Sequence, residues 1–185
     1  MHSLIEKGLK DEFEKRAKEY FEADGYKAWL SAILAEAKKP EGVHRRYSPE
    51  FALYVLVKAI NVFDIKVDAE LKKTLTNIDT FFNEVDLGVK GHPWQLIYKH
   101  LALFCLKNGN KNDAQRYVVK IDPTAYDDGQ IISAITNHCK FVVYEALGNK
   151  DKAKEYETKT NECVKHVNPE INEIEFDNIF KYMYN

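Results

Sequence analysis

The chain has 185 residues, of which 45% are hydrophobic and 30% charged, so its composition is that of an ordinary globular protein and excludes a disordered chain. The formal net charge of −2 gives no long-range field that would attract nucleic acid or an acidic membrane surface, and neither is expected as a partner. Three cysteines, an odd number, do not indicate a disulfide framework and favour a reducing compartment. The longest apolar run, Phe51 to Val57, is too short to cross a bilayer, so we expect a cytoplasmic protein.

Two helices are expected before residue 40, because apolar residues recur there at steps of three and four. The first carries its apolar positions from Ile5 to Tyr20 and ends near Gly25. The second runs from Tyr26 to Lys39. It stops before Pro40, because proline disfavours the helical conformation in the residue that precedes it.

Two further helices are expected between Ser48 and the glycine-containing segment 87–91. Ser48 suits the N-cap of the third helix, and the proline that follows suits its first turn. Residues 51–63 are apolar almost all round, which predicts a central helix covered on several sides. Asp68 caps the fourth helix, which carries one continuous apolar stripe. The stripe consists of Leu71, Leu75, Ile78, Phe82 and Val85.

The second half of the chain predicts five more helices joined by short turns. Turn signals precede or follow each of them: His92-Pro93, Asn108-Gly109-Asn110, Asp127-Asp128-Gly129, Gly148-Asn149 and Asn168-Pro169. No segment alternates in the manner of a strand, so the predicted fold class is all-α. We expect a single domain over residues 1–185, with a divergent N-terminal part (1–90), two hairpins (93–169) and a C-terminal capping helix (169–184).

A repeated pattern appears when the chain is aligned with itself so that Gly109 falls on Gly148. Gly, Asn, Lys, Ala and Tyr then recur in register between residues 109–117 and 148–156. Glycine permits the left-handed turn that ends one helix, and asparagine caps the next. The small alanine allows a partner helix to approach closely, and the tyrosine three positions on fills the space beside that contact. The pattern predicts one supersecondary unit used twice.

This pattern resembles tetratricopeptide repeats. The first copy follows the order of the family over Tyr98, Leu101, Ala102, Gly109, Ala114, Tyr117 and Pro123. The second keeps Gly148, Ala153 and Tyr156, but it has Asn137 and Lys140 where the family has large apolar residues. The spacing from Gly109 to Gly148 is also longer than the family value of about 34 residues. The resemblance covers roughly residues 93–169.

The resemblance implies helical hairpins stacked as a right-handed superhelix or closed as a compact bundle, which bind a peptide or a partner helix and catalyse nothing. Its register directs six residues toward the concave binding face: Lys99, Leu103, Leu106, Lys107, His138 and Glu145. Leu103 and Leu106 lie off the main apolar stripe of their helix. They therefore form either a docking surface or a contact with the N-terminal helices, and we favour the contact.

An alternative function follows from the segment before the third helix. Arg45 and Arg46 precede Ser48, and two guanidinium groups beside the free N–H groups of a helix start could hold a phosphate or carboxylate. This would make the chain an anion-binding or small-ligand-binding regulatory domain. An ordinary solvated loop before a capped helix gives the same pattern.

Catalytic and metal-binding patterns give no positive support for an enzyme. The sequence lacks the glycine-rich nucleotide loops, the nucleophile elbow and the zinc-protease motif, and we expect neither catalysis nor a cofactor. His138-Cys139 and Cys163-x-x-His166 have a spacing that matches no common zinc pattern, so no metal site is expected. Another protein or peptide remains the expected partner.

Overall fold

The computed structural model describes residues 15–16, 18–20, 23, 25–40, 43–85, 87, 92–122 and 130–167. These ranges contain helices and no strand, which confirms the all-α fold class. The chain divides into two compact units, Met1–Pro93 and Trp94–Asn185. The single domain expected over residues 1–185 stays a prediction. The expected first helix lies largely outside the described residues, and the expected last helix (169–184) lies entirely outside them.

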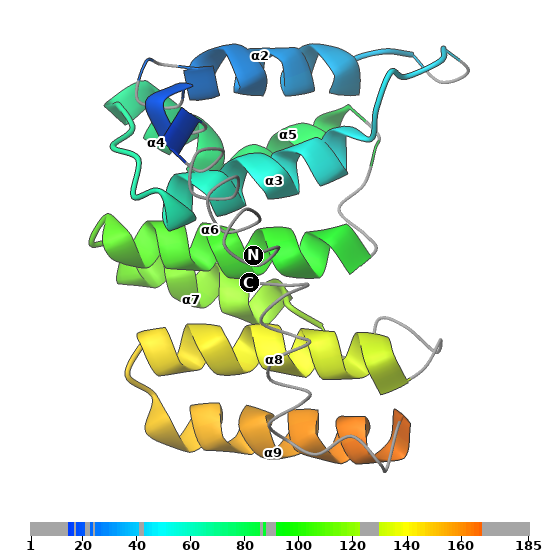
Figure 1. Ribbon diagram of the computed structural model, residues 1–185, viewed down its shortest axis with the longest axis vertical. Coiled ribbons are helices and arrows are strands. Elements are labelled where there is room, and N and C mark those ends of the chain that lie inside the picture. The colour runs from blue at the N-terminus through cyan, green and yellow to red at the C-terminus, as the bar shows by residue number, and fades with distance from the viewer. Residues whose placement is uncertain are drawn as a thin grey trace, which may run out of the picture. The chain divides into compact units, whose positions relative to one another are not determined.

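The first unit contains four described helices, which are shown in Figure 1: α2 (Tyr26–Ala37), α3 (Pro49–Val62), α4 (Ala69–Thr76) and α5 (Ile78–Glu84). Helix α2 packs along α3. The described core of this unit is apolar and includes Leu30, Ile33, Leu53, Leu56, Ile60, Leu75, Ile78 and Phe82. Burial of these side chains supplies the main driving force for packing the four helices.

Helix α3 begins where the sequence predicts. The hydroxyl of Ser48 accepts the backbone N–H of Phe51 at 3.2 Å, and the proline that follows occupies the first turn. The prediction that the helix is covered on several sides is wrong in part, because Phe51 is 59% exposed and Val62 is 61% exposed. The buried residues of α3 lie mainly on one face, and the Phe51 and Val62 side chains leave that face as the helix turns by about 100° per residue.

The fourth predicted helix is interrupted at Asn77 and forms two helices, α4 and α5. Asp68 caps α4 as expected, since its carboxylate accepts the N–H of Leu71 at 2.8 Å. The Thr76 hydroxyl and the Asn77 side-chain amide then donate to backbone carbonyls one turn earlier, at 2.8 and 3.0 Å. Such side chains compete with the backbone for hydrogen bonds and are weak helix formers, which explains the break.

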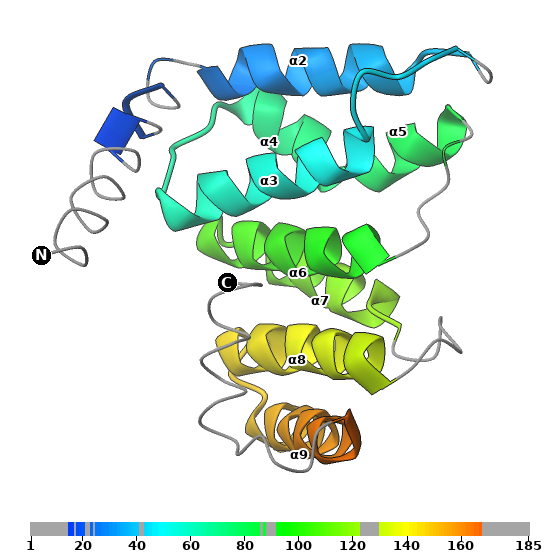
Figure 2. The same cartoon turned by 45° about the vertical axis from the view of Figure 1, so that its right-hand side comes forward.

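The second unit contains the helices α6 (His92–Lys107), α7 (Lys111–Lys120), α8 (Gln130–Ala146) and α9 (Lys150–Val167), with α6 beginning at the boundary between the units. Consecutive helices run antiparallel, so that α6 and α7 form one hairpin and α8 and α9 another (Figures 1 and 2). Helix α8 packs against both α7 and α9. The core of the unit includes Trp94, Ile97, Leu101, Tyr117, Ile135, Cys139 and Val143.

Candidate functional site

The turn between α6 and α7 ends one helix and starts the next with a single Gly-Asn pair. Gly109 has a φ of 75°, and its N–H donates to the carbonyl of Leu106 at 3.0 Å. The N–H of Asn110 donates to the carbonyl of Cys105 at 2.8 Å, which completes a Schellman motif. The Asn110 side chain accepts the N–H of Asp113 at 3.1 Å and so caps α7. The pair therefore satisfies backbone groups of both helices.

The turn between α8 and α9 repeats these bonds at the equivalent positions of the second hairpin. Gly148 has a φ of 74°, and its N–H donates to the carbonyl of Glu145 at 2.9 Å. The N–H of Asn149 donates to the carbonyl of Tyr144 at 2.9 Å, and its side chain accepts the N–H of Lys152 at 3.2 Å. The recurrence predicted from the sequence is thus a recurrence of backbone conformation and hydrogen bonding.

The two repeated tyrosines stack on different partners. Tyr117 stacks on Tyr98 of α6, with ring centroids 5.8 Å apart and an interplanar angle of 29°. Tyr156 stacks on Tyr144 of α8, with 5.5 Å and 15°. These partners do not correspond when Gly109 is aligned with Gly148, so the hairpins share their turns but differ in the aromatic contacts that pack them.

A groove with a volume of about 690 Å³ lies between α7 and the turn that joins α8 to α9. Its lining comprises Lys111, Gln115, Val118 and Val119 on one side and Tyr144 and residues 147–152 on the other. Val119 is 72% exposed, so the groove offers accessible apolar surface. This described lining includes three lysines, at positions 111, 150 and 152, and a single acidic residue, Asp151. The groove is therefore partly apolar and rimmed by positive charge.

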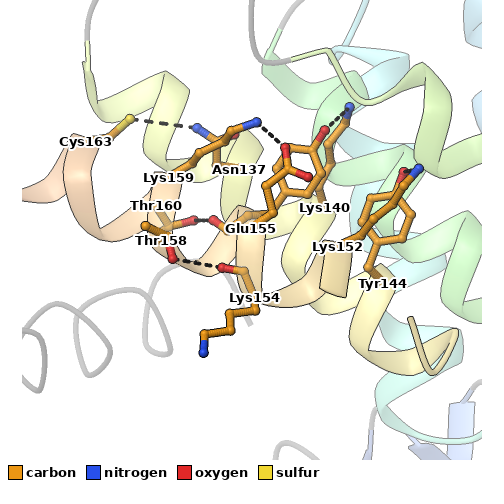
Figure 3. A network of polar contacts seen from close by, with 11 residues as sticks. Asn137, Lys140, Tyr144, Lys152, Lys154, Glu155, Thr158, Lys159, Thr160 and Cys163 are labelled. Atoms are coloured by element: carbon orange, nitrogen blue, oxygen red, sulfur yellow. Dashed lines mark hydrogen bonds and ion pairs between the residues drawn. The ribbon is translucent and has the colours of Figure 1, made fainter. Parts of the chain in front are cut away.

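Lysine side chains contact the stacked tyrosines, Tyr144 and Tyr156 (Figure 3). The Lys152 ammonium lies 3.5 Å from the hydroxyl oxygen of Tyr144, and the Lys140 ammonium lies 3.3 Å from that of Tyr156. Each ammonium also lies 5.0 Å from the centroid of the same ring. A cation over a tyrosine face is stabilised by the ring quadrupole. Lys152 and Tyr144 both line the groove, so the contact between them lies within its lining.

Glu155 is the acidic member of this cluster (Figure 3). Lys159 donates a hydrogen bond to its carboxylate, and this bond is the largest cause that lowers the pKa of Glu155. The charges of Lys159, Lys152 and Lys140 lower the pKa further. Several ammonium groups of α8 and α9 thus act on one carboxylate.

Lys99, a residue of α6, is buried and only 2% exposed. Burial lowers the pKa of its ammonium group, and the neighbouring Cys139 opposes that effect. Burial likewise raises the pKa of the Cys139 thiol, which keeps it protonated and unreactive. Burial, and then the charge of Lys99, lower the pKa of His138 to about 4. The structure therefore brings Lys99 and His138, two predicted site residues, close enough to interact electrostatically.

The structure corrects the position expected for Lys99. A side chain on an open concave face should be accessible, whereas the Lys99 side chain is buried. Leu103, Leu106 and His138 are half-buried, and only Lys107 and Glu145 are exposed. The six predicted residues therefore do not form one exposed surface, and their role in binding a partner stays a prediction.

The three residues of the expected anion site have partners within the protein. The Arg45 guanidinium donates to the carbonyl of Lys39 at 3.1 Å, and the backbone N–H of Arg46 donates to the carboxylate of Glu36 at 2.6 Å. The Ser48 hydroxyl donates to the Glu50 carboxylate at 2.8 Å while it caps α3. Carboxylates of the chain itself thus accept the Arg46 backbone N–H and the Ser48 hydroxyl, and a backbone carbonyl accepts from Arg45.

The described residues offer neither a metal-binding cluster nor a membrane span. Within these ranges, no group of three or more His, Cys, Asp or Glu side chains gathers as a metal would require. The side chain of His166, one of the four residues considered from the sequence, lies outside the described residues. No helix in the described part of the chain combines the length and the apolar character needed to cross a membrane.

Comparisons of the chain with models of protein families, with curated proteins and with solved structures gave no match. The likeness to tetratricopeptide repeats accordingly stays a prediction, supported by the sequence pattern and the repeated turn geometry. The groove itself was not predicted from the sequence, because it combines α7 with a turn that is distant along the chain. One signal was available: the self-alignment places a lysine directly after both Gly-Asn pairs, as Lys111 and Lys150.

Proposed function

We propose that the chain is a protein-interaction module of the tetratricopeptide-repeat type, whose helical hairpins bind a peptide or a partner helix without catalysing a reaction. The observation that carries this proposal is the double use of one turn, with matching hydrogen bonds at Gly109-Asn110 and Gly148-Asn149. Repetition of one supersecondary unit is the mark of architectures whose main use is to present a binding surface.

The groove between α7 and the α8–α9 turn is the binding surface that we favour. It contains exposed apolar surface at Val119 and half-buried apolar surface at Leu147, both of which an incoming side chain could cover. Several of its polar residues, among them Lys111, Asn149 and Lys150, lie at helix starts and turn positions where the repeated hydrogen bonds occur. A preformed groove loses little conformational entropy when a peptide binds to it.

Selection from a random twelve-residue peptide library on the immobilised protein tests this function. Selected peptides should bind the Val119→Gln protein about tenfold more weakly, because the substitution removes apolar contact from the groove, and tenfold corresponds to about 1.4 kcal/mol. Val62→Gln is the matched control, since Val62 is also an exposed valine on a helix but lies in the other unit. Absence of any selected peptide, or equal affinity for all three proteins, would overturn the proposal.

A further inference from the structure

The lysines of the groove oppose the local electrostatics of the helices that carry them. Lys111 is the first residue of α7, and Lys150 is the first residue of α9. The N-terminus of a helix carries a partial positive charge, so a lysine there is less favourable than an acidic residue. Asp113 and Asp151 offset this only in part, and Arg116 already pairs with Asp113. The repeated turn therefore places two cations where helix stability favours anions.

Further lysines lie near the groove and outnumber the acidic residues there. Lys152 lines the groove and lies over the Tyr144 ring, and Lys140 and Lys159 lie over the adjoining Tyr156 ring at 5.0 and 4.7 Å. Asp151 is the single acidic residue of the described lining, and Glu155 is already bonded to Lys159. An occupant that carries negative charge would meet several cations and few anions here, which is the condition for electrostatic complementarity.

We infer that the groove binds an acidic segment of another protein, in which Asp or Glu carboxylates flank an apolar side chain. The apolar side chain covers Val119 and Leu147, and the carboxylates pair with Lys111, Lys150 and Lys152. This inference rests on the proposed function, and it specifies the chemistry of the partner. A bound carboxylate interacts favourably with the lysine and with the positive end of the helix dipole, which offsets the unfavourable cation–dipole interaction at each helix start.

The groove suits an acidic polypeptide better than a nucleic acid. None of its described lining residues is an arginine, the side chain that forms bidentate hydrogen bonds with phosphate. Tyr144 is 7% exposed, and its ring already stacks on Tyr156, so its face is not open to an unpaired base. The apolar lining also suits a leucine-like or phenylalanine-like side chain.

Charge reversal at the two helix starts gives a decisive variant. Lys111→Glu/Lys150→Glu removes the attraction for carboxylates and places acidic residues where the helix dipoles favour them. Its melting temperature should therefore equal or exceed that of the wild type, so lost binding cannot be ascribed to unfolding. Lys66→Glu/Lys154→Glu makes the same change in net charge at exposed lysines outside the groove and serves as the control.

The random twelve-residue library is selected in parallel on the wild type and on both double variants. The wild-type and control pools should be enriched in Asp and Glu around an apolar residue, and the groove variant should lose that enrichment. A labelled synthetic copy of the leading peptide should bind the groove variant at least tenfold more weakly, with wild-type affinity falling as salt rises from 0.05 to 0.5 M, about the range over which charges become screened.

The outcomes separate the two proposals. A wild-type pool of neutral or basic peptides that still depends on Val119 overturns the acidic partner and leaves the interaction module standing. No enrichment on any protein overturns both. Tighter binding of a labelled single-stranded oligonucleotide than of the acidic peptide, with the same dependence on Lys111 and Lys150, identifies a nucleic acid as the occupant and overturns the inference.

Discussion

Gly109 and Gly148 share one backbone conformation, with φ angles of 75° and 74° in the turns of two successive hairpins. Other residues reach this left-handed region only at an energetic cost. A methyl group placed on either α-carbon would meet nothing within 4 Å, so space is available at both positions. The need for glycine therefore comes from the backbone alone, and it is the same need in both turns.

Replacement of either glycine by alanine should destabilise the protein by about 1 kcal/mol, the usual cost of a left-handed alanine. Gly109→Ala and Gly148→Ala should lower the free energy of unfolding by nearly equal amounts, because the conformation and the surroundings of the two glycines match. Asparagine tolerates the left-handed region better, so Gly109→Asn should cost less than Gly109→Ala. Urea unfolding measures all three. A large difference between the two alanine variants would contradict the equivalence of the turns.

The capping hydrogen bonds of Asn110 and Asn149 predict that replacing either residue lowers the free energy of unfolding. Asn149→Ala should lower the free energy of unfolding by about 1 kcal/mol, because the N–H of Lys152 loses its acceptor. Asn110→Ala should cost more, since Asn110 also donates to the side chain of Asp113. Asn161→Ala, within α9, provides a control that keeps or raises stability, because alanine favours helix interiors. Equal stability of all three proteins would exclude a capping role.

The helix starts were predictable from the sequence because each depends on local chemistry. Ser48, Asp68 and Asn110 accept the backbone N–H groups that their positions require, and no distant residue is needed. The break at Asn77 was missed because the apolar stripe continues through it: Leu75 and Ile78 are both buried on either side. A spacing of three to four positions between apolar residues shows which face is buried and does not detect a short interruption of the helix.

The interior position of Lys99 and the groove were not predictable in the same way. The repeat register assigned Lys99 to an open face, but burial depends on which helices cover it, and packing partners are not encoded in local periodicity. The groove likewise requires α7 to lie beside a turn that follows the whole of α8 along the chain. Lys111 and Lys150, which each follow a Gly-Asn pair, are the one feature of the sequence that points to the groove.

The loop before α3 is anchored by Glu36, whose carboxylate lies 2.7 Å from the Lys39 ammonium and 2.6 Å from the backbone nitrogen of Arg46. These two hydrogen bonds are the main causes that lower the pKa of Glu36. Glu36→Gln removes the charge, so trypsin should cleave faster after Arg45 and Arg46. Glu84→Gln, at an exposed position in α5, is the control. Unchanged cleavage rates would show that the loop is held by other contacts.

His138 gives the protein a dependence of stability on pH. Its pKa is about 4 in the folded state against 6.5 as the ordinary value, so the unfolded chain binds the proton more readily. The contribution is fully present above pH 6.5 and is lost as the pH falls toward 4. Between pH 7.5 and 5.0 the loss should reach up to about 2 kcal/mol. Urea unfolding at both pH values should show a smaller loss for His138→Gln, and an identical loss would contradict the assignment.

Nuclear magnetic resonance titration of the His138 imidazole checks the physical causes of that pKa. Burial is the larger cause and the charge of Lys99 is the second, so Lys99→Met should raise the His138 pKa without restoring it to 6.5. Methionine also fits a buried position better than an ammonium group, so the variant should fold and allow direct comparison with the wild type at neutral pH. A wild-type midpoint near 6.5 would place His138 in solvent, and an unchanged midpoint in Lys99→Met would place the two side chains too far apart to interact.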